Sequence, residues 1–158
     1  MTDTLSPGQR SERMGRVRNK DTKPELRVRR LVHAMGYRFR LHRKDLPGKP
    51  DLVFPSRQAV ILVHGCFWHR HPDPACPLTR TPKSRLEFWG PKFESNRARD
   101  IRNEAELTRL GWRVLTVWEC GLRDVEGLRR TIEAFLGPRG VACARSSCSP
   151  VPGGSPSA

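Results

Sequence analysis

The sequence predicts an α/β fold in which a mixed central sheet is flanked by helices. Two observations predict it. Apolar residues recur at helical spacing in three separate stretches of the chain. The continuous apolar run Ala59–Val63 is typical of a buried central strand. The expected order of elements is helix, three strands, helix, strand, helix.

The first helix is predicted over Lys23–Met35. Thr22 and Glu25 have the spacing of a capping box, and Pro24 suits the first helical turn. Apolar residues then recur at helical spacing, and Gly36 marks the end of the helix. The local signals for this element therefore agree with one another.

Three strands should follow this helix. Tyr37–Leu41 places apolar side chains on alternate positions, as a half-buried strand does. A turn with the sequence LPGKP leads into the short strand Asp51–Phe54. The buried strand Ala59–Val63 completes the set. The polar and aromatic stretch after it, HGCFWHRHPDPACP, is predicted as a loop.

The rest of the domain contains two helices and a strand. A long helix is expected within Phe88–Leu110, closed by Gly111. Arg113–Trp118 is predicted as a strand and Val125–Leu136 as a helix with one apolar side.

The chain divides by composition into a basic arm at residues 1–20, a folded domain at 21–137 and a Gly, Pro and Ser-rich tail at 138–158, for which we expect disorder. The net charge of +14 attracts polyanions, so nucleic acid is the first expected partner. No apolar run approaches the roughly 20 residues that cross a bilayer, and the N-terminus does not resemble a signal peptide. We therefore expect a cytoplasmic protein that does not enter membranes.

Three residues at a spacing of five, Cys66, His71 and Cys76, lie in the predicted loop, and Cys120 follows the strand Arg113–Trp118. In a reducing compartment such a set more often binds metal than forms disulfides. Four ligands with no open position are typical of structural zinc. The alternative is that the cysteines are buried core residues and His71 is solvated. Asp73 or a water is an alternative ligand to Cys76, and Cys143 and Cys148 in the tail are interpreted as free thiols.

Candidate catalytic groups are carboxylates and an imidazole. Asp51, at the start of a short strand, could bind Mg²⁺, which activates water for phosphodiester hydrolysis. It could equally be a turn residue without chemistry. His69 suits general acid or base catalysis near neutral pH, but it could also be a zinc ligand. Asp100 could orient that imidazole or form a helix salt bridge with a neighbouring arginine. Glu25 is explained by capping alone.

Aromatic residues are concentrated around the loop. Phe67 and Trp68 are adjacent, so both can hardly face the core, and loop aromatics of a basic protein can wedge between base steps. Phe88 and Trp89 follow, and at least one of them is expected to pack on its helix.

The chain resembles the very-short-patch-repair (Vsr) mismatch endonucleases. The similarity runs from about Ser11 to about Leu136 and rests on the segments RMGRVRNKDTKPE, Pro50-Asp51, HGCFWH (64–69), Glu87-Phe88-Trp89, Asn96 with Arg99-Asp100, GWRVL (111–115) and VWEC (117–120).

The resemblance implies a restriction-endonuclease-like α/β core with a structural zinc site. It also implies an enzyme that nicks duplex DNA on the 5′ side of the T in a T:G mismatch, left by 5-methylcytosine deamination, and that leaves a 5′-phosphate. Other mismatch repair proteins are possible partners, and a monomer is expected.

The resemblance also assigns residue roles. It implies Mg²⁺ binding by Asp51 and the Val63 carbonyl, and catalysis by His69 with support from Asp100 and from Glu25 near the metal-bound water. It further implies zinc binding by Cys66, His71, Cys76 and Cys120, and DNA contacts by Phe67, Trp68, Trp89 and Met14.

Two other readings are compatible with the residues. A related enzyme of this fold would nick matched DNA. A noncatalytic zinc-stabilised module would bind DNA with strong salt dependence and give no Mg²⁺-dependent product. RNA binding is a weaker third reading.

Overall fold

The computed structural model describes residues 6, 8–9, 12 and 20–139. The predicted DNA contact Met14 and the two tail thiols, Cys143 and Cys148, lie outside the described residues. The rest of the predicted site lies inside them.

The sheet has three strands in the order β1-β2-β3. β1 (Leu52–Phe54) runs antiparallel to β2 (Ala59–His64), and β2 pairs in parallel with β3 (Arg113–Trp118). The central strand is thus the apolar run, as the sequence predicted, and the sheet is mixed. A short 3-10 helix, Pro55–Arg57, joins β1 to β2.

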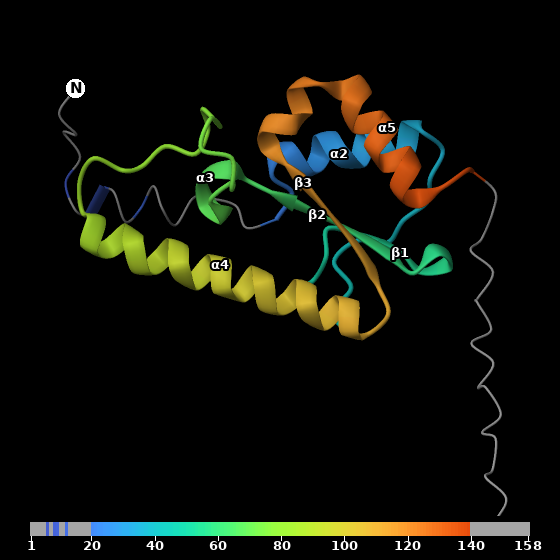
Figure 1. Ribbon diagram of the computed structural model, residues 1–158, viewed down its shortest axis with the longest axis horizontal. Helices are drawn as coiled ribbons and strands as arrows, with labels where there is room; N and C mark the ends of the chain where they lie inside the picture. The colour runs from blue at the N-terminus through green and yellow to red at the C-terminus, as the bar shows by residue number, and fades with distance from the viewer. Residues whose placement is uncertain (1–5, 7, 10–11, 13–19, 140–158) are drawn as a thin grey trace, which may run out of the picture.

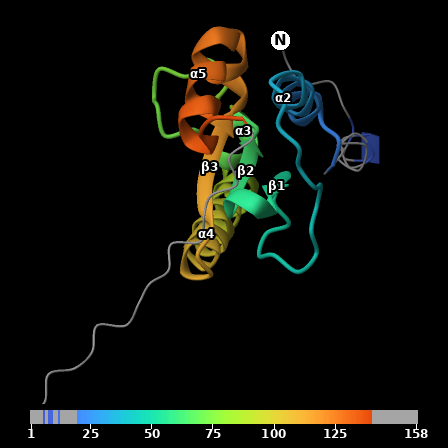
Figure 2. The ribbon, with the colours of Figure 1, turned by 90° about the vertical axis from the view of Figure 1, so that its right-hand side faces the viewer.

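Helices cover both faces of this sheet. α2 (Lys23–Ala34) and α5 (Val125–Leu136) lie on one side, and α4 (Leu86–Arg109) crosses the other (Figures 1 and 2). The prediction of a mixed sheet flanked by helices is therefore confirmed. A second 3-10 helix, Glu119–Arg123, connects β3 to α5.

The strand residues divide between two cores because successive side chains point to opposite faces. Ile61 and Val63 belong to the larger core under α2 and α5, whereas Val60 belongs to the smaller core that holds Leu107 of α4. Both cores are anchored on β2. The segment that follows β2 in the chain therefore starts from the central, largely buried strand of the sheet.

The prediction of a strand at Tyr37–Leu41 is wrong. Only Arg40 pairs with the sheet, through two 2.8 Å hydrogen bonds with Val53. Tyr37 is buried, but its hydroxyl donates to the carbonyl of Gly137 at 2.7 Å, and Leu41 is 43% exposed. His42 has the left-handed φ of 44°, which turns the chain away from β1 before a ladder can form.

The predicted loop after β2 contains one helical turn, α3 (Cys66–His69). Gly65 precedes it as the N-cap, and Arg70 follows it as the C-cap, whose left-handed φ of 53° redirects the chain. A longer connection then leads to α4, against which α3 packs. Among the described residues, no helix is both long and apolar enough to cross a membrane.

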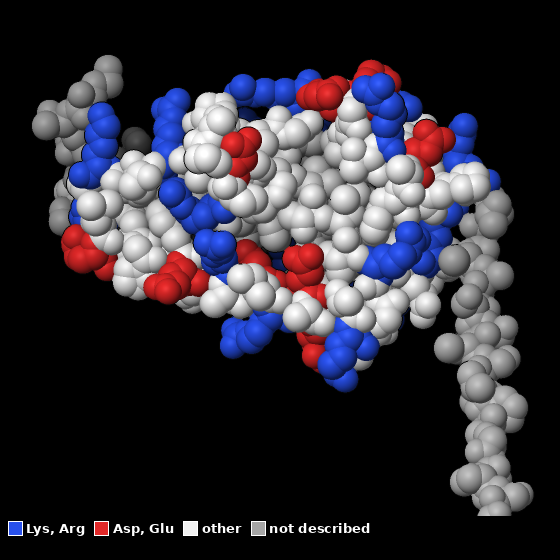
Figure 3. Space-filling model, in the orientation of Figure 1, with Lys and Arg blue, Asp and Glu red and all other residues white. Residues whose placement is uncertain are grey.

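Lys and Arg side chains are spread over the face shown in Figure 3, with acidic side chains between them. Positive charge is therefore distributed over this face and not confined to one edge.

Candidate active site and metal centre

Asp51 lies immediately before β1, beside the end of β2. Its Oδ2 accepts the backbone N–H of Val63 at 2.7 Å, which fixes the carboxylate across the antiparallel pair. This contact involves the backbone amide of Val63, whereas the predicted metal ligand is the backbone carbonyl of the same residue. Asp51 is only partly exposed, so its second oxygen is the one left for a ligand.

The surroundings of Asp51 are unfavourable for an isolated negative charge. Burial, with a smaller contribution from the negative charge of Glu25, raises the pKa of Asp51 to about 6. The Val63 amide, the Arg29 guanidinium and the His69 imidazole act in the opposite direction. Asp51 is therefore close enough to Glu25 and His69 to interact electrostatically with both.

The raised pKa of Asp51 predicts that the free energy of unfolding differs between the wild type and Asp51→Asn. The pKa of Asp51 is higher in the folded chain, about 6, than the ordinary value of 3.8, so the folded state binds the proton more tightly. Without a cation, stability therefore falls as the pH rises through this window. We expect Asp51→Asn to be the more stable protein at about pH 7.5, by up to about 3 kcal/mol. Urea unfolding without added divalent cations should show a gap that closes below about pH 4, and a pH-independent gap would contradict the argument.

Glu25 is buried in the first turn of α2, and both of its side-chain oxygens accept hydrogen bonds. Its Oε1 accepts the Thr22 hydroxyl at 2.8 Å, and its Oε2 accepts the Asp21 amide at 3.0 Å and the Arg29 guanidinium at 3.1 Å. The Thr22 hydroxyl in turn accepts the Glu25 amide at 3.4 Å. The predicted cap is present, although Glu25 reaches the amide of Asp21 in place of that of Thr22. Glu25 is thus held rigidly near Asp51.

Asp21, Glu25 and His42 come close enough together to suggest a second cation site. The guanidinium of Arg29 fills it, at 2.5 Å from Asp21 and 2.9 Å from the ring of His42. This group is therefore an internal charge network that holds Glu25.

His69 and Asp100 form a close pair between α3 and α4. Nδ1 of His69 lies 2.5 Å from Oδ2 of Asp100, whereas Arg99 approaches the other Asp100 oxygen only at 4.0 Å. Asp100 was predicted either to orient the imidazole or to pair with a neighbouring arginine. The structure places it on the imidazole of His69. Asn96, one turn earlier on α4 and 7% exposed, donates to the carbonyl of Trp68 at 3.2 Å and fixes α3 on α4.

His64 is a site residue to which the sequence reasoning gave no role. Its ring stacks on that of His69 with centroids 4.0 Å apart and planes within 5°. Burial lowers the pKa of His64 to about 4, and the neighbouring imidazole acts in the same direction. His64 is therefore neutral near pH 7. His64 is the last residue of the buried strand β2 and follows Val63. This position was the feature of the sequence that could have indicated a role in the site.

The predicted aromatic residues form one cluster at the N-terminal end of α4. Phe67 lies edge-on to Trp68 and to Trp89, with centroids 5.1 and 5.5 Å apart. Phe93 joins them, stacked on Trp89 at 5.5 Å. Phe67, Trp68 and Trp89 are only partly buried, and Phe88 is 47% exposed. The cluster therefore presents aromatic surface outside both cores.

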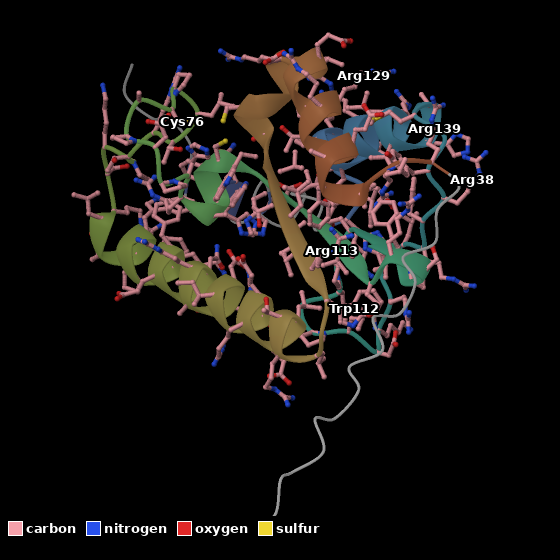
Figure 4. The ribbon with its side chains drawn as sticks, turned by 45° about the vertical axis from the view of Figure 1, so that its right-hand side comes forward. Arg38, Cys76, Trp112, Arg113, Arg129 and Arg139 are labelled. Carbon is pink, nitrogen blue, oxygen red and sulfur yellow. The ribbon has the colours of Figure 1, made fainter. Side chains whose placement is uncertain are left out.

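Three thiols lie close together where α3, the connection before α4 and the 3-10 helix Glu119–Arg123 meet. The sulfur atoms of Cys66, Cys76 and Cys120 lie within 4.8 Å of one another, and Cys66 and Cys76 are buried. Cys120 donates its amide to the sulfur of Cys66 at 3.4 Å, and Figure 4 labels Cys76 in the connection before α4. Soft thiolate donors at this spacing fit zinc. Cys76, in the connection between α3 and α4, therefore lies close enough to the other two thiols to share a metal ion with them.

His71 is adjacent to this cluster but outside the set of mutually close ligand atoms. Its ring packs edge-on to Trp118 at 4.6 Å, and Nδ1 accepts the Asp73 amide at 3.2 Å. A neutral imidazole that binds a metal carries either the metal or a proton on Nδ1. His71 can therefore serve as the fourth ligand only by giving up the hydrogen bond from Asp73.

Comparison with known proteins identifies the family. A family model described as DNA mismatch endonuclease Vsr matches residues 2–74. The type II nicking enzyme V.XorIIP of Xanthomonas oryzae pv. oryzae (strain KACC10331 / KXO85) is 56% identical over 138 residues, which are 87% of this chain and 99% of that protein. The chain belongs to the Vsr family. It is therefore an endonuclease.

Other relatives extend the Vsr assignment. DNA mismatch endonuclease Vsr of Escherichia coli (strain K12) is 43% identical over 128 residues, covering 81% of this chain and 80% of that protein. The type II nicking enzyme V.NmeAIP of Neisseria meningitidis serogroup A / serotype 4A (strain DSM 15465 / Z2491) is 41% identical over 124 residues, covering 78% and 86%. The names of these Vsr relatives include both a mismatch endonuclease and nicking enzymes.

Proposed function

We propose that the chain is a Mg²⁺-dependent, strand-specific endonuclease that nicks duplex DNA on the 5′ side of the T in a T:G mismatch and so starts very short patch repair. The observation that carries the proposal is the approach of two chemically different groups at the end of β2. These are the buried carboxylate of Asp51 and the imidazole of His69 held by Asp100. A cation site beside an oriented imidazole is what phosphodiester hydrolysis needs.

The carboxylate of Asp51 and the backbone carbonyl of Val63 would hold the Mg²⁺ ion. The donors fit, because Mg²⁺ prefers oxygen ligands and usually binds through one or two carboxylates together with water and phosphate oxygens. The raised pKa of Asp51 fits as well, since a cation removes the cost of its buried charge. When bound, the ion would offset charge on the phosphate and lower the pKa of a bound water.

His69 would accept or donate the proton that is transferred during hydrolysis of the phosphodiester bond. Asp100, on its Nδ1, favours the tautomer and orientation that leave Nε2 for the substrate, and it stabilises the protonated ring. The stacked, neutral ring of His64 limits the orientations open to His69 without adding a second positive charge. Glu25 would accept a hydrogen bond from water beside Asp51.

The aromatic cluster would open the base step next to the mismatch. Partly exposed rings of Phe67, Trp68 and Trp89 are suited to insertion between base pairs. A T:G wobble pair costs less to unstack than a matched pair, so deformability would contribute to recognition. The thiol cluster would hold zinc and fix the shape of the segment that carries Phe67, Trp68 and His69.

A second candidate function is nicking of matched DNA. The names of V.XorIIP and V.NmeAIP are the reason to test it, because they describe nicking enzymes and mention no mismatch. The catalytic arrangement serves both functions equally, because it acts on the phosphate. The difference lies in which base step the aromatic cluster can open.

A duplex comparison tests the proposed function. T:G and T:A duplexes of the same sequence, labelled on each strand in turn, are incubated with and without Mg²⁺ under single-turnover conditions in several flanking contexts. We expect one Mg²⁺-dependent cut, 5′ to the T, only in the mismatched duplex. Equal cutting of both duplexes supports the matched-DNA alternative. Binding without any Mg²⁺-dependent product would overturn the enzymatic role of this site.

A further inference from the structure

A groove along α4 lies beside the site and has no part in the function proposed so far. It measures about 520 Å³ and is lined by Arg70, Phe93, Glu94, Arg97, Ala98 and Ile101. Apart from Arg70, all its residues come from α4, at spacings that place them along one stripe of the helix. Ile101 is 59% exposed. We call this feature the α4 groove.

The α4 groove is continuous with both parts of the site. Phe93 forms one wall and also contacts Phe67 and Trp89, with centroids 5.2 and 5.5 Å away. Arg70 directly follows His69, and Ile101 directly follows Asp100. A DNA strand that reaches the catalytic pair and the aromatic cluster therefore passes next to this groove.

Its cationic groups are arranged to receive an anion. The guanidinium of Arg70 lies 4.7 Å from the centre of the Phe93 ring and donates to the Arg80 carbonyl at 3.1 Å. These contacts fix its planar group before a ligand arrives, which reduces the entropic cost of binding. The exposed Arg97 adds a second guanidinium, so the groove stays positive despite the carboxylate of Glu94.

We propose that the α4 groove binds a backbone phosphate of the DNA, next to the base step that the aromatic cluster opens. Phosphates are recognised by guanidinium groups through charge-assisted hydrogen bonds. Insertion of rings lengthens the backbone at the opened step, and a phosphate contact beside the inserted rings holds the strand in that position. The inference rests on the proposed DNA substrate, but not on its mismatch.

The test measures the salt dependence of DNA binding. Dissociation constants are determined by fluorescence anisotropy for T:G and T:A duplexes over a range of salt concentrations, without Mg²⁺. The variants are Arg97→Ala and Arg97→Lys. Arg129→Ala is the matched control, because Arg129 lies on α5 at the other face of the sheet, where it pairs with Glu126 (Figure 4). Thermal melting checks that each variant folds.

A phosphate contact weakens binding equally on every duplex when it is lost. We expect Arg97→Ala to bind both duplexes several-fold more weakly and to lower the slope of log Kd against log salt by about one. Arg97→Lys should retain most of the slope, and Arg129→Ala all of it. An unchanged slope in Arg97→Ala, or a loss confined to the T:G duplex, would overturn the inference. Failure of the proposed function would instead appear as wild-type nicking without mismatch preference.

Discussion

Asp51→Asn is expected to reduce single-turnover nicking by on the order of 10³-fold or more while leaving DNA binding nearly unchanged. The physical reason is the loss of the carboxylate that would hold Mg²⁺, and with it several kcal/mol of charge stabilisation on the reacting phosphate. Asparagine keeps the volume of the side chain, and its carbonyl oxygen can still accept the Val63 amide. The variant should therefore fold.

His33→Ala serves as the matched control for this experiment. His33 is exposed in the last turn of α2, away from the end of β2, so its removal should change neither the rate nor the affinity. Anisotropy with the T:G duplex separates binding from cutting. Nicking by Asp51→Asn at the wild-type rate would contradict the proposal that Asp51 holds the catalytic metal ion.

Cys120→Ser is expected to release a bound zinc ion and to lower the unfolding free energy by about 3 kcal/mol or more, roughly a 10 °C fall in melting temperature. Cys120, just after β3, lies close to Cys66 at the start of α3 and to Cys76 in the connection before α4, so a shared zinc ion would join the three segments. Losing one ligand therefore frees a long segment that has little apolar core of its own. The nicking rate should fall with it, since that segment carries His69.

Cys148→Ser is the control for the zinc experiment, because this cysteine was interpreted as a free thiol. Metal content per chain, measured by mass spectrometry, and melting temperature are compared for the two variants and the wild type. We expect zinc close to one ion per chain in the wild type and in Cys148→Ser only. A wild-type protein that contains no zinc, with Cys120→Ser equally stable, would contradict the proposed centre.

Helices and strands with strong local patterns could be predicted from the sequence. The capping residues around Glu25 and the apolar run of β2 gave α2 and β2 nearly their observed bounds. Whether the segment Tyr37–Leu41 joins the sheet could not be predicted from its own residues, because pairing also depends on the partner strand. β1 has only three residues, and the chain turns away at His42.

The site could be predicted less well, because its contacts join distant segments. His69 and Asp100 are 31 residues apart, and Cys66 and Cys120 are 54 apart. Composition and spacing left alternatives open for each of these residues, and only the family resemblance connected them. The turn α3 was missed because contacts from elsewhere hold it, among them the one from Asn96 to the Trp68 carbonyl. The stacking of His64 on His69 was missed for the same reason.

The central claim is that Asp51 and His69 act on a single metal-bound phosphate. The most direct measurement adds Mn²⁺ in place of Mg²⁺ to the zinc-loaded protein and records the imidazole proton resonances by NMR. Paramagnetic broadening falls steeply with distance from the ion. We expect the signals of His69 and His64 to broaden, that of His33 to stay sharp, and the effect to vanish in Asp51→Asn. Sharp His69 signals with Mn²⁺ bound, or broadening that survives in Asp51→Asn, would contradict the claim.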